Sequence, residues 1–181
     1  MTRKLLLVCL GVGVLFAPSL AQVTIRPKPV NAVRVLCAAN VAASAAADTT
    51  ENVLLTCPLA ANTLGTNGTL RVWMLWAYTN GANNKTFRVR LGGASGTQFL
   101  NVSATTTATA SILVMIANRN AANAQIGWTT AQAGGLGTSA SAVTTGTVDT
   151  AADSSVVISC QKATAGDTCT LERALIEVVV P

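Results

Sequence analysis

The residues best suited to chemistry gather in one segment, "NTLGTNGTLRVWMLWAYTNGANNKTFRVRLGG" at 62–93. Two tryptophans, a tyrosine, a phenylalanine and several arginines stand there, whereas most of the chain consists of small and polar residues. An arginine guanidinium is attracted to the face of an indole ring, and both side chains are favoured in binding faces and subunit interfaces. These residue types therefore indicate recognition rather than catalysis.

A strand over 69–78 and a second over 86–91 would position these side chains on two faces, because successive residues of a strand point to opposite sides. If the two strands form a hairpin with Tyr78 opposite Phe87, one face is an apolar core layer. The other face carries the candidate site residues, with Arg90 opposite Leu75: Arg71, Trp73, Leu75, Arg88 and Arg90.

A solvent-facing side of an antiparallel strand is normally polar, so a tryptophan and a leucine there predict that something covers this face. Three kinds of cover remain open: a loop of the same chain, a neighbouring subunit, or a ligand such as a sugar or an anion.

The chain contains no histidine, which excludes a Ser-His-Asp triad, a Cys-His pair and a histidine metal site. Its seven acidic residues are scattered, and none has an aromatic neighbour within three positions to suggest a sugar platform. Asp149 and Asp153 could share a calcium ion, although loop acids are more often turn formers. We therefore expect no enzyme activity and no cofactor, with a secreted hydrolase that gathers acids from separate loops as the weaker alternative.

Residues 1–21 have the pattern of an export signal, with a basic start "MTRK", an apolar stretch "LLLVCLGVGVLF" and small residues before the expected cleavage after Ala21. The alternative is a retained N-terminal arm. Residues 22–32 contain two prolines and are expected to form an extended arm, which leaves 33–181 as one domain. The net charge of +5 is too weak to predict a nucleic-acid binder.

Four cysteines follow this N-terminal segment, an even number that predicts two disulfides in a secreted protein. Three connectivities are possible, and we favour Cys37–Cys57 and Cys160–Cys169 because each would clamp a local hairpin. A zinc site is the alternative, but the chain has neither histidine nor CxxC spacing.

Short runs rich in Val, Ile, Leu and Thr alternate with Gly, Asn, Asp and Ser clusters, a pattern that predicts an all-β, antiparallel β-sandwich. The last strand is expected to be central and covered on both faces, and the alanine-rich 38–48 to form a helical turn or two. The expected strands are 33–38, 52–56, 69–78, 86–91, 97–102, 110–118, 124–129, 141–148, 154–160 and 169–179.

The segment at 62–93 resembles a family of small bacteriophage and prophage structural proteins that carry the pattern "NTLG.NG.LR…LW.YTN..NNKT.RVR.GG". The likeness continues through "IANRNAANAQIG" at 116–127, "GLGTSASAVTTGTVDT" at 135–150 and "CTLERALIEVVV" at the end of the chain. It implies a jelly-roll sandwich on a virion surface, as a tail, fibre, spike or capsid-decorating component. Members of this kind are usually multimeric. The export signal and the cysteines depart from the family's pattern.

This resemblance implies a homo-oligomer that works with other virion proteins, and a host-surface glycan as a further partner. The expected location is the virion surface or the extracellular medium. The alternative functions are a secreted carbohydrate-binding module, with Trp73 and the arginines as its platform, and a bacterial surface adhesin.

Overall fold

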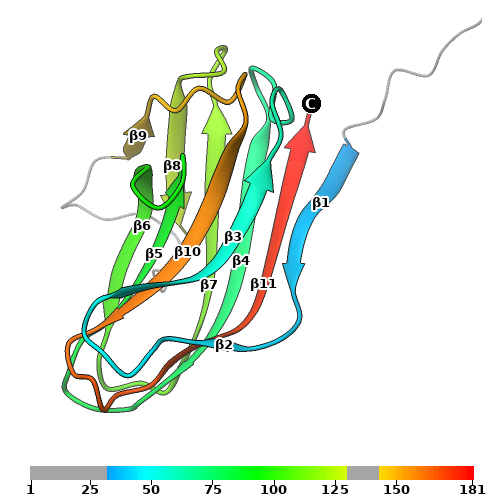
Figure 1. Cartoon of the computed structure of the whole chain (residues 1–181). Helices are drawn as coiled ribbons and strands as arrows, with labels where there is room; N and C mark the ends of the chain where they lie inside the picture. The colour runs from blue at the N-terminus through cyan, green and yellow to red at the C-terminus, as the bar shows by residue number, and fades with distance from the viewer. Residues whose placement is uncertain (1–31, 130–142) are drawn as a thin grey trace, which may run out of the picture.

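The computed structural model describes residues 32–129 and 143–181, and these form strands and connections without a helix (Figure 1). The expected signal and most of the expected arm lie outside the described residues. The strands are β1 (Ala32–Ala39), β2 (Ala43–Ser44), β3 (Glu51–Leu59), β4 (Thr69–Tyr78), β5 (Lys85–Leu91), β6 (Thr97–Ala104), β7 (Thr109–Asn118), β8 (Gln125–Thr129), β9 (Thr144–Gly146), β10 (Ser154–Lys162) and β11 (Cys169–Val180).

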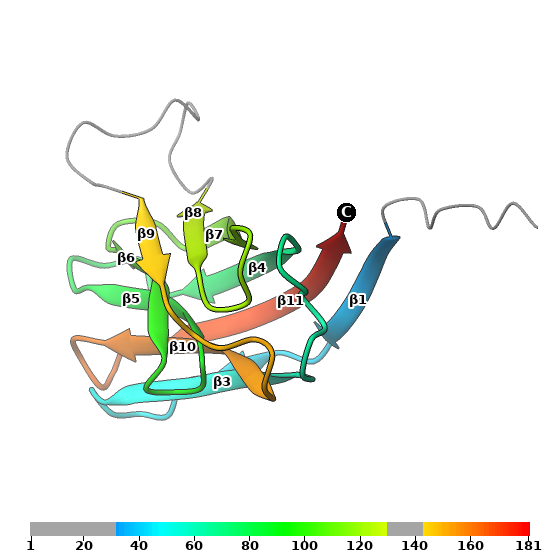
Figure 2. The same cartoon turned by 90° about the horizontal axis from the view of Figure 1, so that it is seen from above.

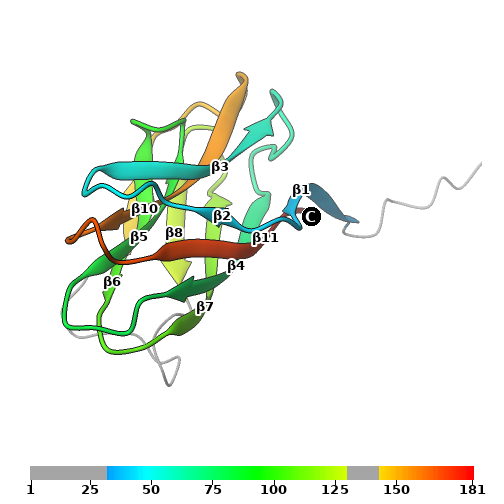
Figure 3. The ribbon, with the colours of Figure 1, turned by 60° about the horizontal axis from the view of Figure 1, so that its bottom comes forward.

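Every expected strand coincides with one of these, apart from short differences at the ends. The expected strand 141–148 is observed over Thr144–Gly146, and residues 141 and 142 lie outside the described part. The helical turn expected within 38–48 is not present. The short strand β2 runs along β11 there instead, because Ala43 and Ser44 extend to pair with Leu171 and Thr170 (Figure 3).

The strands form two antiparallel sheets that pack face to face (Figure 2). The large sheet has the order β1-β11-β4-β7-β8-β9, with β2 also paired to β11, and the small sheet has the order β3-β10-β5-β6. The chain crosses from one sheet to the other after β2, β3, β4, β6, β9 and β10. The arrangement of β1-β11-β4-β7 against β3-β10-β5-β6 is a jelly roll, which confirms the predicted fold class.

The core lies between the two sheets. Trp76 of β4 stacks on Phe87 of β5 with ring centroids 4.6 Å apart, and Tyr78 lies 5.1 Å from the same ring. The predicted core layer is buried as expected, but its two halves meet across the sandwich rather than across a hairpin. The inward residues of β4 and β5 are Leu70, Val72, Met74, Trp76 and Tyr78, and Phe87, Val89 and Leu91.

Both favoured disulfides are formed, Cys37–Cys57 and Cys160–Cys169. Neither clamps a hairpin, and that expectation was wrong. The first joins β1 to β3 and the second joins β10 to β11, so each bond bridges the two sheets. The sandwich is therefore held covalently at two places, as in proteins of an oxidising compartment.

The last strand, β11, is interior to the large sheet, between β1 and β4, but it is covered on one face only. A bulge between Leu171 and Arg173 shifts the alternation, so Leu171 shares the buried face with Ala174 and Ile176. The opposite face carries Arg173, Leu175, Glu177 and Val179, which are exposed or half-buried. The described residues of the chain itself put no second layer on that side, so they do not provide the expected cover on both faces.

A buried polar network closes one end of the sandwich, where the segments that carry the phage-protein resemblance come together. Asn118 donates to the carbonyl of Gly65 at 2.6 Å and to Thr150 Oγ1 at 2.8 Å, and it accepts from Gln125 Nε2 at 2.7 Å. Gln125 also donates to the carbonyl of Val148 and accepts from its amide. The side chains of Asn118 and Gln125 therefore hold the loops at Gly65 and at Val148–Thr150 in place, because buried polar atoms must be hydrogen-bonded.

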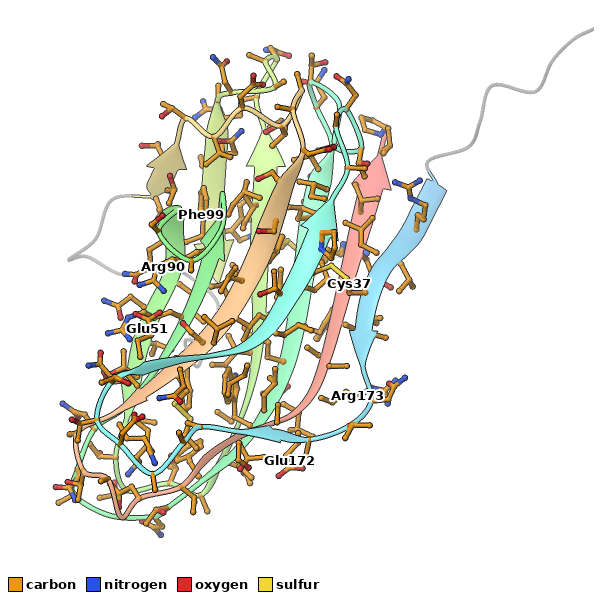
Figure 4. The ribbon with its side chains drawn as sticks, in the orientation of Figure 1. Cys37, Glu51, Arg90, Phe99, Glu172 and Arg173 are labelled. Atoms are coloured by element: carbon orange, nitrogen blue, oxygen red, sulfur yellow. A yellow bond between two sulfur atoms is a disulfide. The ribbon has the colours of Figure 1, made fainter. Side chains whose placement is uncertain are left out.

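Next to this network, Phe99 of β6 fills space that two glycines of the large sheet leave open (Figure 4). A Cβ on Gly127 would stand 2.3 Å from Phe99 Cδ1, and one on Gly146 would stand 2.7 Å from Phe99 Cζ. The ring thus ties β6 to β8 and β9, and glycine is required at both positions.

Candidate functional site

The five residues predicted to share one face lie on opposite sides of the molecule. Arg71, Trp73 and Leu75 are on the outer face of the large sheet, whereas Arg88 and Arg90 are on the outer face of the small sheet. The predicted hairpin register was wrong, since β4 pairs with β7 and β11, and β5 pairs with β6 and β10. The connection at 79–84 crosses between sheets, so the outward sides of the two strands point apart.

The polar face is the outer surface of the small sheet around Glu51, Arg88 and Arg90 (Figure 4). Both carboxylate oxygens of Glu51 accept hydrogen bonds from Arg90, and Arg88 Nη1 lies 3.4 Å from Glu51 Oε2. Ser159 donates to the same carboxylate, and Arg88 donates to Gln161 Oε1 at 2.8 Å. The arginine side chains are only 15% and 14% exposed, and both donate to side chains of β10, Arg88 to Gln161 and Arg90 to Ser159.

Two guanidinium groups share one carboxylate at this face, and Arg88 Nη1 is buried with an ion-pair contact to Glu51 but no hydrogen bond. Burial opposes ionisation of Glu51, but the hydrogen bonds from Arg90 and Ser159 and the charge of Arg88 outweigh it. They hold the pKa of the Glu51 carboxyl below its ordinary value. The cluster contains no aromatic side chain, and its guanidinium groups donate to Glu51, Gln98 and Gln161 of the same sheet. The cluster therefore links neighbouring strands of the small sheet and has the character of a structural contact.

The apolar face is the outer surface of β11, β4, β7 and β8, centred on Trp73. Trp73 is 45% exposed and Leu75 is 46% exposed, and Trp128 of β8 is 41% exposed. In the sheet register Trp73 lies between Leu175 of β11 and Leu113 of β7, which makes one apolar row across three strands. Large hydrophobic side chains thus stand in contact with water in the middle of a sheet, where a solvated face would be polar.

Charged residues are few on the apolar face, and two of them, Arg71 and Glu177, stand in matched positions. Arg71 is the cross-strand partner of Glu177, and on its other side it faces Met115, which in turn faces Trp128. On the other side of the Trp73 row, Leu75 lies opposite Arg173.

A shallow hollow of about 260 Å³ lies between β4 and β11 on this face. Its walls are formed by Trp73, Leu75, Ser111, Arg173 and Leu175, with Met74 at its base. The lining is mostly apolar with one guanidinium and one hydroxyl, which suits an apolar side chain or the face of a sugar ring.

Sequence reasoning found the β4 part of this face and missed the rest. Leu175, Glu177 and Arg173 were not assigned to it, because the last strand was expected to be covered on both faces. Met115 and Trp128 gave no local signal, since only the order of strands brings β7 and β8 beside β4.

The calcium hypothesis at Asp149 and Asp153 finds no support. Asp149 Oδ1 accepts from the amide of Ala151 at 2.9 Å, which is a turn-forming contact. Asp153 Oδ1 accepts from the amide of Ala61 at 2.8 Å and so ties the loop before β10 to the segment after β3. Within residues 32–129 and 143–181 no three side chains of His, Cys, Asp or Glu come together as a metal site. In the same residues no helix has the length and hydropathy of a membrane span.

No protein-family model and no curated protein matches the chain. Among solved structures, the chain is similar to lectin I of Ulex europaeus, solved with the methyl glycoside of α-L-fucose. The identity is 8% and the TM-score is 0.39, over 81% of this chain and 91% of the lectin. It is also similar to a chain of infectious bursal disease virus, strain Gx, at 9% identity and a TM-score of 0.24, over 84% of this chain and 40% of the viral one. Likenesses this distant carry no argument about function.

Proposed function

We propose that this protein is a non-enzymatic structural component of an extracellular particle, a bacteriophage virion surface protein that acts by assembling through its apolar face. The observation that carries the proposal is the exposure of Trp73 and Leu75, side by side with Leu175, in the centre of the large sheet. Burial of such side chains contributes about 25 cal/mol per Å² of apolar surface, so an assembled state that covers this face is favoured over a state in which water contacts it.

The edges of the sandwich favour assembly through this face rather than by pairing of strands. The edge strand β1 contains a bulge between Val35 and Cys37, and Arg34 lies opposite the buried Val178, on the inward side of the sheet. The edge strand β3 carries Pro58, which cannot donate a ladder hydrogen bond. Bulges, inward charges and prolines are the usual protections against edge-to-edge pairing.

The two disulfides support a particle that persists outside the cell, because bonds between the sheets oppose opening of the sandwich. The proposed partners are other copies of this chain and other virion proteins, with a host-surface glycan as a further ligand and no nucleic acid.

A carbohydrate-binding module is the second candidate, and the hollow beside Trp73 favours it. An exposed indole next to Arg173 and Ser111 supplies a stacking surface together with hydrogen-bond donors for a sugar. A monomer whose tryptophan fluorescence changes with a polysaccharide would identify this function.

The proposed function is tested by sedimentation of the native material, followed by non-reducing peptide mass spectrometry of the pellet and the soluble fraction. We expect the protein in virus-sized particles, with peptides linked through Cys37–Cys57 and Cys160–Cys169. Recovery of the protein only in the soluble fraction, together with a response on a glycan array, would replace the virion proposal by the binding module.

A further inference from the structure

We propose that the apolar face binds a second copy of this chain, face to face, about a twofold axis that runs along the strands between β4 and β11. This inference rests on the proposed assembly role of the same face and names its partner. It follows from the register of β4 and β11. When the β4 of one copy lies over the β11 of another, apolar residues meet apolar residues and Arg71 meets Glu177.

An axis in this position lays β4 of one copy over β11 of the other. Each residue of β4 then lies over the partner subunit's copy of the β11 residue with which it pairs in its own sheet. Trp73 then lies over Leu175 of the partner subunit, and Leu75 over Arg173 of the partner subunit. The first contact is apolar on apolar. In the second, the aliphatic stem of arginine covers leucine while the guanidinium reaches the rim.

The charges distinguish this axis from one that runs across the strands through the row of Arg71. With the axis between β4 and β11, Arg71 lies over Glu177 of the partner subunit, and the reverse contact repeats it. An axis across the strands through the same row would set Arg71 over Arg71 of the partner subunit. Like charges brought together in an interface are strongly unfavourable, whereas a matched pair adds specificity.

The shape of the face agrees with this pairing. The hollow of about 260 Å³ between β4 and β11 is bordered by Leu175, so the partner subunit's Trp73 is placed at its rim. The strands that overlap about this axis are β1, β11, β4 and β7, and four outward rows of these strands cover roughly 500 Å² of plan area per copy, from the spacing of strands and residues. Side-chain relief increases the accessible area, which brings it near the low end of stable interfaces. The expected complex is a dimer of moderate affinity.

The test uses charge reversal and mixing, with mass measured by light scattering and sedimentation equilibrium at up to about 100 µM protein, the range for moderate affinity. The wild-type chain is expected to be a dimer. Arg71→Glu alone and Glu177→Arg alone each place like charges across the axis and raise the dissociation constant at least about tenfold. An equimolar mixture of the two variants is expected to restore the dimer, because each supplies the charge that the other needs.

The mixture separates an intermolecular contact from damage within one chain. Each single variant also sets like charges side by side on β4 and β11, and mixing cannot relieve that mismatch. The double variant Arg71→Glu with Glu177→Arg restores both contacts and is expected to be a dimer with wild-type thermal stability.

Three outcomes overturn the inference: a monomeric wild-type chain, a dimer that both single variants leave intact, and a mixture that stays monomeric. A monomer whose Trp73 becomes accessible to acrylamide only after removal of residues 1–31 shows that this segment covers the face. These outcomes are separable from failure of the proposed function. A monomer in solution that still sediments with virus-sized particles retains the function, and a dimer absent from any particle retains the inference.

Discussion

Trp76 of β4 and Phe87 of β5 stack across the interior at 4.6 Å, although the strands that carry them belong to different sheets. Because consecutive strands face each other in this way, their outward residues stand on opposite sides of the molecule. One side is the polar face, braced by Glu51, and the other is the apolar face, centred on Trp73. The two faces predict different responses to mutation.

On the apolar face, Trp73→Ala is expected to abolish self-association and to change the unfolding free energy of the monomer by less than about 1 kcal/mol, since the side chain is already 45% exposed. Val53→Ala is the matched control, because Val53 is 49% exposed on the small sheet. Light scattering and thermal unfolding give the two readouts. Equal oligomer mass for both variants would show that the apolar face is not the interface.

Removal of either disulfide is expected to destabilise the fold without changing its topology. The double variant Cys37→Ala with Cys57→Ala opens a link across 20 residues and should cost about 3 kcal/mol by loop entropy. Cys160→Ala with Cys169→Ala opens a link across 9 residues and should cost about 2.5 kcal/mol. Chemical denaturation of the three proteins measures both differences, and unchanged midpoints would contradict a stapling role.

The glycines under Phe99 offer a test of packing. Gly127→Ala places a Cβ 2.3 Å from the ring and is expected to cost about 1–3 kcal/mol, because overpacking forces a shift of side chains or backbone. Gly166→Ala is the control, since a Cβ there meets nothing within 4 Å. Combining Gly127→Ala with Phe99→Leu should recover part of the loss, and a double variant no better than the sum of its parts would argue against a direct clash.

The buried network predicts a large loss for one amide. Asn118→Ala removes the hydrogen bonds that the Asn118 side chain makes with Gly65, Thr150 and Gln125, and it leaves buried polar atoms unpaired. The free energy of unfolding measured with denaturant should fall by about 2–3 kcal/mol. Asn83→Ala, at an exposed loop position, should change stability by less than about 0.5 kcal/mol. Similar values for the two variants would mean that the network is dispensable.

Acid stability depends on Glu51. A carboxyl whose pKa is lower in the folded chain than in the unfolded chain adds stability above the unfolded value, and this is lost as the pH falls through the folded pKa. The pKa of Glu51 lies below its ordinary value of 4.5, so its contribution should be present at neutral pH and decline as the pH falls below about 4.5. Glu51→Gln should therefore lower the unfolding temperature at pH 7 and flatten its decline on acidification. Glu172→Gln removes an exposed carboxylate of β11 and is the control. The same flattening in both variants would show that the change in net charge, and not the Glu51 contacts, causes the acid dependence.

The sequence by itself determined where the strands lie, because apolar runs bounded by Gly, Asn and Asp have few other solutions. It also determined which residues of β4 and β5 face the core, since a period of two needs no knowledge of neighbours. The favoured cysteine pairs were right, but the reason was wrong: each disulfide joins the two sheets and neither clamps a hairpin.

Only the tertiary structure decided which strands pair. The connection at 79–84 has the residues of a tight reversal, and the same residues allow a crossing between sheets, so Arg88 and Arg90 could not be separated from Trp73 by local pattern. The bulge beside Glu172 likewise moves Arg173, Leu175 and Glu177 to the outer face (Figure 4). Strand partners are set by the burial of whole sheets against each other, an energy that no single segment contains.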